Sequence, residues 1–186
     1  FVRMEDFEES DSGIIRSFGL ITTKPLFYIA NVDEDALADA PIQKIEDAAR
    51  QRGREVVSIC GKLEQDLSVL PEEERASFME LYGMEEFSIE KIIHVGYRIL
   101  NLITFYTIVG KVMRAWTIPR GTPCVKAAGK IHTDMEKGFI RAEVINIDEF
   151  IACGSEHAAR EKGLLRLEGK EYIVQDGDIL HIRFNV

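Results

Sequence analysis

The sequence predicts a mixed fold, in which an α/β unit is followed by a smaller α+β unit. The short apolar run 26–32 is typical of a strand that is buried on both faces of a parallel sheet, and residues 55–60 are interpreted as a second such strand. From Ile103 onward, short β-rich segments alternate with glycines, which is typical of a small mixed sheet. The 186 residues are enough for one or two small domains.

The first unit is expected to contain a βαβ motif. Residues 1–22 are acidic and then mixed, so we expect a loose end followed by a helix over 13–20. Between the two apolar runs, apolar residues repeat at helical spacing until Gly53. They are Ile42, Ile45, Ala48 and Ala49. A strand, a helix and a strand at this spacing predict parallel pairing. Because two strands need neighbours that the sequence does not supply, we expect residues 1–100 to be marginally ordered or stabilised by self-association of the incomplete sheet.

Two further helices are expected before the second unit. Pro71, followed by three glutamates, is a typical helix start, and this helix should stop near Gly83. Ser88 is the expected N-cap of a longer helix. The buried stripe of that helix should consist of Ile89, Ile92, Ile93, Gly96, Ile99 and Leu100.

The second unit should begin near Asn101 and contain a small sheet packed on a helix. The expected strands cover residues 103–109, 114–118, 140–145, 172–174 and 179–184. Helical segments are expected over residues 147–153 and 155–162. This alternation predicts an α+β unit.

The composition excludes several classes of protein. Hydrophobic residues make up 46% and charged residues 30%, as in ordinary globular proteins. No apolar run approaches the roughly 20 residues of a membrane span, and the N-terminus lacks the pattern of a signal peptide. The three cysteines form no CxxC motif, so neither a zinc site nor a disulfide framework is indicated. We expect a cytoplasmic protein with reduced thiols and, because the chain does not begin with Met, a fragment or a processed form.

The net charge of −9 conceals an asymmetry. Residues 1–100 contain 11 basic and 21 acidic residues, whereas residues 101–186 contain 12 and 11. Seven basic residues lie within 111–141 and are opposed only by Asp134 and Glu136. They are Lys111, Arg114, Arg120, Lys126, Lys130, Lys137 and Arg141. Such a run is most often a solvated face, but it also fits a surface that binds RNA.

Two motifs follow the two predicted parallel strands, where ligands of α/β sheets bind. Asn31-Val32-Asp33-Glu34 resembles the Asn-Lys-x-Asp motif of P-loop GTPases, with Val32 and Glu34 at the altered positions. The longer carboxylate should impair pairing with guanine, and the Val32 carbonyl could accept a hydrogen bond from adenine instead. Cys60-Gly61-Lys62 resembles the Ser-Ala-Lys purine loop, and Gly61 would allow the backbone to approach the base. Each motif alone also fits an ordinary polar turn.

The remainder of the chain carries a longer pattern. It reads Arg114-Ala115-Trp116-Thr117-Ile118, then Ala127-Ala128-Gly129-Lys130-Ile131-His132-Thr133-Asp134, and finally Gly169-Lys170-Glu171-Tyr172-Ile173-Val174-Gln175-Asp176-Gly177-Asp178-Ile179. This pattern is similar to the TGS domain of the Obg-like ATPase (YchF) family, almost continuously over residues 101–186. The Asn31 and Cys60 motifs then fall where that family carries its base-recognition elements.

The resemblance implies a fold and a domain arrangement. Residues 1–22 would be the end of an inserted helical region or connector. Residues 23–100 would be the C-terminal part of a P-loop NTPase G domain, comprising its last βαβ motif and the helices that follow. Residues 101–186 would be a ubiquitin-like β-grasp TGS domain.

The resemblance also implies a function. Asn31, Val32, Glu34, Cys60, Gly61 and Lys62 would surround the base of ATP or GTP, and the partner would be the ribosome or its RNA. The phosphate-binding motif GxxxxGK[ST] is absent from all 186 residues, and so are the ligands of the expected Mg²⁺. We therefore expect no hydrolysis by this chain alone. The alternative is a stand-alone TGS module that binds RNA, ribosomes or a protein, with no nucleotide role.

Overall fold

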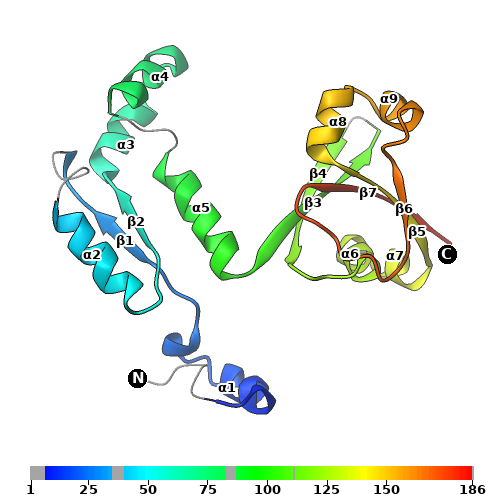
Figure 1. The fold of residues 1–186 in the computed structure, drawn as a ribbon, viewed down its shortest axis with the longest axis horizontal. Helices are drawn as coiled ribbons and strands as arrows, with labels where there is room; N and C mark the ends of the chain where they lie inside the picture. Colours follow the sequence, from blue (N-terminus) through cyan, green and yellow to red (C-terminus); the bar gives the residue numbers. More distant parts are fainter. Residues whose placement is uncertain (1–6, 35–39, 83–86, 111, 186) are drawn as a thin grey trace. The chain divides into compact units, whose positions relative to one another are not determined.

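The chain forms two compact units in a computed structural model, Phe1–Ile99 and Leu100–Val186 (Figure 1). The structure describes residues 7–34, 40–82, 87–110 and 112–185. The mixed α/β fold class expected from the sequence is confirmed. Each unit has its own strands and its own apolar cluster, and each is described separately below.

The first unit contains a two-stranded parallel sheet, as the spacing of its elements predicts. Strands β1 (Tyr28–Asn31) and β2 (Val56–Ile59) pair in register from Tyr28 with Val56 to Asn31 with Ile59. Helix α2 (Ala40–Arg50) connects them, and Gly53 follows it with a positive φ of 63°. Before the sheet lie α1 (Ser12–Ser17) and the 3₁₀ turns Glu9–Asp11 and Ile21–Thr23.

Three helices follow β2: α3 (Gly61–Ser68), α4 (Glu72–Leu81) and α5 (Ser88–Ile99). The core beneath them is small, with Cys60, Leu63 and Leu67 buried against partly covered neighbours. Gly83, the expected end of α4, lies outside the described residues. The Arg98 guanidinium forms two hydrogen bonds with Glu55, at 2.9 and 2.6 Å, and joins α5 to the residue before β2.

Two expectations for α5 were wrong. Ser88 is the first helical residue rather than the N-cap, and its backbone N–H donates to the Glu64 carboxylate of α3 at 2.9 Å. The predicted stripe is also not buried throughout, because Ile89, Ile93 and Leu100 are half or more exposed and Val95 is the buried apolar residue. The periodicity therefore identifies an apolar face that the described residues leave partly exposed.

The second unit is built on a five-stranded sheet in the order β4-β3-β7-β5-β6. Its strands are β3 (Leu102–Val109), β4 (Val112–Pro119), β5 (Phe139–Asn146), β6 (Arg166–Glu168) and β7 (Asp178–Phe184). The two central strands β3 and β7 are parallel, and the other neighbours pair antiparallel.

Helices cover both faces of this sheet. One face packs on α6 (Cys124–Ile131) and α7 (Thr133–Lys137) around an apolar core that includes Phe105 and Leu180. The other packs on α8 (Ile147–Cys153) and α9 (Glu156–Glu161) around Ile145 and Ile179. The strand alternation therefore sends odd and even residues of one strand into two different apolar layers.

Some details of the second unit differ from the expectation. Helices α6 and α7 were not predicted, and neither was β6. The expected strand 172–174 is an irregular segment with one isolated bridge, between Pro123 and Ile173. It carries Tyr172, whose hydroxyl donates to the buried Asp178 carboxylate at 2.7 Å, so its role is to close the core rather than to extend the sheet.

Among the described residues, none of the helices combines the length and apolarity that crossing a membrane requires.

Candidate functional site

The two motif-bearing strands end side by side. Asn31 is paired with Ile59, and the backbone N–H of Val32 donates to the Ile59 carbonyl at 2.9 Å. Because the strands are parallel, the chain leaves both at the same edge of the sheet. The segments that begin with Val32 and with Cys60 are therefore held next to each other.

A side chain joins these two segments directly. The Oδ1 atom of Asn31 accepts a hydrogen bond from the backbone N–H of Gly61 at 3.1 Å. Gly61 is the first residue of α3, where backbone N–H groups lack partners within the helix, so Asn31 satisfies one of them from outside. A Cβ atom at Gly61 would lie 3.4 Å from Asn31 Oδ1, which is ordinary contact, so alanine would fit.

The charged members of the expected site also face one another. Lys62 Nζ lies 4.0 Å from Glu34 Oε1, and the two side chains are 79% and 36% exposed. An exposed pair at this distance contributes little to stability. Both groups are therefore available to a ligand at the ends of β1 and β2.

Cys60 differs from the other expected site residues. Its side chain is 3% exposed and packs against Leu63 and Leu67 beneath α3. The arrangement of Asn31, Val32, Glu34, Gly61 and Lys62 thus offers backbone groups, one carboxylate and one ammonium, which suits recognition of a polar planar ring by hydrogen bonds.

The basic candidates of the second unit divide between surfaces. Lys111 lies outside the described residues, and the six others are exposed. Lys126 and Lys130 lie on α6, and Lys126 Nζ is 2.6 Å from Glu136 Oε1, a hydrogen bond that raises the pKa of Lys126. Arg141 lies opposite Arg183 in the register of β5 and β7, and its side chain is on the face of the sheet away from the α6 core. The remaining candidates are Arg114 in β4, Arg120 just after it, and Lys137 at the end of α7.

Trp116 and His132 both have structural roles. Trp116 stacks on Phe105 and donates from Nε1 to Thr107 Oγ1 at 2.9 Å, so its ring belongs to the edge of the core. His132 is the N-cap of α7, and its Nδ1 accepts from the Asp134 N–H at 3.2 Å. His132 therefore belongs to a helix-capping turn.

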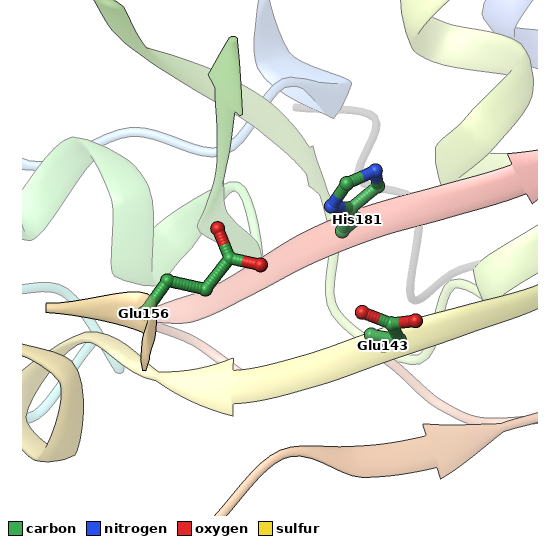
Figure 2. Close-up of side chains that lie close together, drawn as sticks. All are labelled: Glu143, Glu156 and His181. Carbon is green, nitrogen blue, oxygen red and sulfur yellow. The ribbon is translucent and has the colours of Figure 1, made fainter. Parts of the chain in front are cut away.

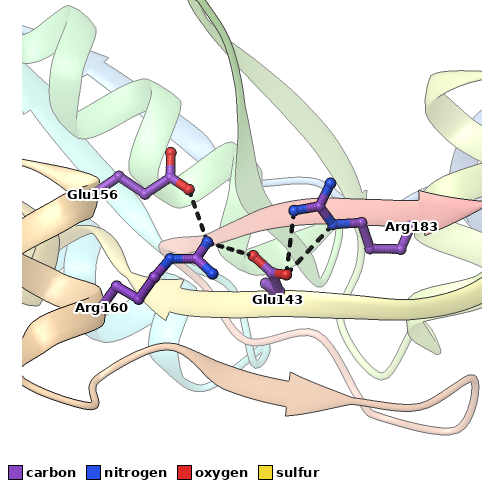
Figure 3. A network of polar contacts seen from close by, with 4 residues as sticks. All are labelled: Glu143, Glu156, Arg160 and Arg183. Atoms are coloured by element: carbon purple, nitrogen blue, oxygen red, sulfur yellow. Dashed lines mark hydrogen bonds and ion pairs between the residues drawn. The ribbon is translucent and has the colours of Figure 1, made fainter.

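A polar network that the sequence analysis missed lies on the α9 side of the sheet (Figure 3). Glu143 is 9% exposed in its side chain and accepts from Arg160 Nη2 at 3.0 Å and from Arg183 Nη2 at 3.3 Å. Arg160 also lies 3.3 Å from Glu156. Burial opposes ionisation of Glu143, but the charges and hydrogen bonds of Arg183 and Arg160 outweigh it and hold the pKa of Glu143 below its usual value.

The same region brings Glu143, Glu156 and His181 together, with ligand atoms within 4.8 Å of one another (Figure 2). Three such groups are a possible cation site on composition alone. However, Arg160 bridges the two carboxylates, and a cation would have to displace it while remaining beside Arg183. We therefore assign this cluster to the attachment of α9 to the sheet.

Comparison with known proteins places these features in context. A family model named YchF-GTPase_C, "Protein of unknown function (DUF933)", matches residues 102–185. The "Ribosome-binding ATPase YchF" of Pasteurella multocida is 44% identical over 186 residues, which are 100% of this chain and 51% of that protein. Its namesake from Bacillus subtilis is 40% identical over 188 residues, covering 99% and 51%.

Solved structures agree with the sequence matches. The "Structure of the Schizosaccharomyces pombe YchF GTPase" superimposes with a TM-score of 0.82 and 33% sequence identity, covering 96% of this chain and 48% of that one. The chain spans about half the length of the curated relatives it matches, and the match lies in their C-terminal half.

Proposed function

The chain belongs to the YchF family, and on that premise we propose that it is the C-terminal part of a ribosome-associated, nucleotide-dependent ATPase. In this proposal the first unit supplies the base-recognition half of the nucleotide site. The second unit supplies an interaction module that contacts the ribosome. The names of the relatives, ribosome-binding ATPases, support both parts.

The hydrogen bond between Asn31 and Gly61 is the observation that carries the nucleotide assignment. It fixes the two strand-end segments at a distance at which both can border one planar ring. Within this site, the Val32 carbonyl would accept from the exocyclic amine of adenine, and Glu34 would remain paired with Lys62. We expect ATP to be preferred to GTP, because Glu34 is one methylene longer than the aspartate that reads guanine.

The proposal assigns phosphate and Mg²⁺ binding to residues outside these 186, because the sequence contains no phosphate-binding loop. This chain should therefore bind a nucleoside through its base alone and should not hydrolyse ATP. A Kd of about 1 mM, or roughly −4 kcal/mol, is a reasonable expectation for such a partial site.

Titration of the ¹⁵N-labelled chain with adenosine, ATP, guanosine and GTP, followed by amide chemical shifts, tests this assignment. Shifts should concentrate at Val32 and Gly61, adenosine and ATP should bind equally, and Asn31→Ala should weaken binding at least fivefold. Gln51→Ala, an exposed position in the same unit, is the matched control. If no nucleoside moves the Val32 and Gly61 signals, the base site does not exist in this chain.

For the second unit we propose a ubiquitin-like β-grasp TGS domain over residues 101–186. The support is the central parallel pair β3–β7, flanked by antiparallel neighbours, with α6 packed on one face. In this view residues 23–100 are the end of a G domain and residues 1–22 the exit of an inserted helical region. The incomplete first sheet would be completed by the remainder of the protein.

The alternative function is a binding module that docks on RNA or ribosomes without any nucleotide. It is favoured by the second unit, which has its own complete core and exposed basic side chains on α6. Co-sedimentation with ribosomes across a salt series tests it, because contacts with phosphates weaken as salt rises. Lys126→Glu combined with Lys130→Glu should release the chain from ribosomes, whereas Lys162→Glu, an exposed control after α9, should not. Equal binding by both variants would remove α6 from the ribosome contact.

A further inference from the structure

Strand β4 is an end strand of the five-stranded sheet with an open outer edge. It pairs with β3 over all eight residues, and in the described part of the chain no strand pairs with its other side. The register has no shift, and the strand contains no proline before Pro119. Natural sheets usually shorten, distort or cover such an edge, so the regular part of the edge around Met113 and Ala115 can accept another strand.

The hydrogen-bond parity of the hairpin shows which backbone groups face outward. In an antiparallel pair, opposite residues alternate between hydrogen-bonded and non-bonded positions. Arg120 donates its N–H to the Asn101 carbonyl at 2.7 Å, so these two residues form a hydrogen-bonded pair. Counted from this pair, bonded and non-bonded positions alternate along β4. Met113 and Ala115 therefore occupy non-bonded positions, and their N–H and C=O groups point away from β3.

The side chains along this edge define the chemistry of a partner. Arg114 is the only charged residue within β4, and Arg120 follows the strand, in a chain whose net charge is −9. Arg114 lies on the α6 face of β4, on the same side as Trp116. Val112 and Met113 are 57% and 42% exposed, so the edge also offers two apolar side chains to a partner.

We propose that the outer edge of β4 binds an extended acidic segment of a partner protein as a sixth strand. The added strand exchanges hydrogen bonds with the backbone of Met113 and Ala115. Its acidic residues alternate on the α6 face and lie near Arg114. Its apolar residues lie on the opposite face, beside the Met113 side chain.

Other occupants fit this edge less well. A second copy would bring two basic edges together, with Arg114 of each strand near that of the other. RNA has phosphates for Arg114, but it has no repeating backbone that matches the outward N–H and C=O groups or the apolar side chains. The combination of an open backbone, apolar side chains and positive charge is specific to an acidic polypeptide.

Fluorescence anisotropy of the complete 186-residue chain with a fluorescein-labelled peptide, TEVDVET, tests the proposal. The peptide should bind, and the basic counterpart TKVKVKT should bind at least tenfold more weakly. Ala115→Pro should weaken TEVDVET at least tenfold, because proline removes an outward N–H while the bonds to β3 remain. Ala115→Val, which keeps the N–H, should bind like the wild type.

A charge variant keeps the test valid if Ala115→Pro unfolds, which the thermal unfolding curve of the variant would reveal. Arg114→Glu retains every backbone group and should reverse the order of the two peptides. The proposal is overturned if TEVDVET fails to bind, or if folded Ala115→Pro and Arg114→Glu both bind it like the wild type. It is also overturned if an RNA oligonucleotide, and not the peptide, loses affinity in these variants.

Discussion

Replacing Glu143 by glutamine tests whether the buried network holds α9 on the sheet. The carboxylate lies on β5 and accepts hydrogen bonds from Arg160 of α9 and Arg183 of β7. Glutamine has nearly the same volume, but it has no charge and turns an N–H₂ group toward one of the guanidiniums. The substitution therefore removes the electrostatic attraction and leaves the packing in place.

The expected loss of stability is about 2 kcal/mol. A hydrogen bond to a charged group contributes about 1.5–3 kcal/mol, and Glu143 has two such partners. Arg160 and Arg183 are 53% and 46% exposed, so water replaces part of what each loses, and the total lies well below the sum of two such bonds. For a unit of this size, that loss lowers the melting temperature by roughly 8–16 °C.

Urea unfolding followed by tryptophan fluorescence measures this loss of stability in the second unit, which contains Glu143. Trp116 is the only tryptophan of the chain and packs at the edge of the core of the second unit. Glu156→Gln is the matched control, because Glu156 contacts the same Arg160 from an exposed position on α9. Its cost should stay below about 1 kcal/mol.

The pH dependence gives the sign of the effect independently. The folded-state pKa of Glu143 is lowered from 4.5, so its contribution is complete above that value and is lost as the pH falls through the folded-state pKa. Wild type and Glu143→Gln should differ at pH 7 and converge in acid. A difference that is within about 0.5 kcal/mol at pH 7, or one that persists unchanged in acid, would refute the reasoning.

Two other substitutions should behave as follows. Gly138→Ala should destabilise the second unit by about 2–3 kcal/mol, because the new Cβ would overlap the backbone carbonyl of Asn185. Gly129→Ala should cost less than about 1 kcal/mol, because only the Glu136 side chain must move. Urea unfolding of both variants tests this difference. In the native chain, Ellman's reagent should label a single thiol rapidly, and Cys153→Ser should abolish that rapid phase. The reason is that Cys60 and Cys124 are buried, and burial raises the pKa of Cys124 to about 12. A rapid phase that survives in Cys153→Ser would contradict this.

The sequence predicted the first sheet and the proximity of its two motifs for a sound physical reason. The apolar segments 26–32 and 55–60 predict strands, and one connecting helix makes them parallel. Their expected burial on both faces was wrong for β1, because Tyr28 and Ile29 are 40% and 49% exposed. Parallel strands place their carboxyl ends at one edge, so Asn31 and Gly61 had to be neighbours. The hydrogen bond between them required coordinates, because sequence does not specify which backbone group an asparagine side chain reaches.

The missed elements lacked such strong signals. Helix α6 is only eight residues long, contains Gly129, and buries the small residues Cys124, Ala127 and Ala128 rather than a large apolar stripe. Their spacing of three and four was the available clue. Glu143 stands between buried Ala142 and Val144, and its partners lie 17 and 40 residues away, so nothing local indicates that it is buried.

The two units differ in how completely they cover their apolar side chains, and this affects how the candidate site should respond to a ligand. Among the described residues, the buried cluster around Cys60 has three members, whereas the one around Phe105 has twelve. Ile29 of β1 and Ile93 of α5 remain about half exposed in the first unit. A unit with so little buried apolar area opens locally at low free-energy cost. A ligand that bridges Val32 and Gly61 binds only the closed arrangement, so by linkage it must stabilise the first unit in proportion to its occupancy.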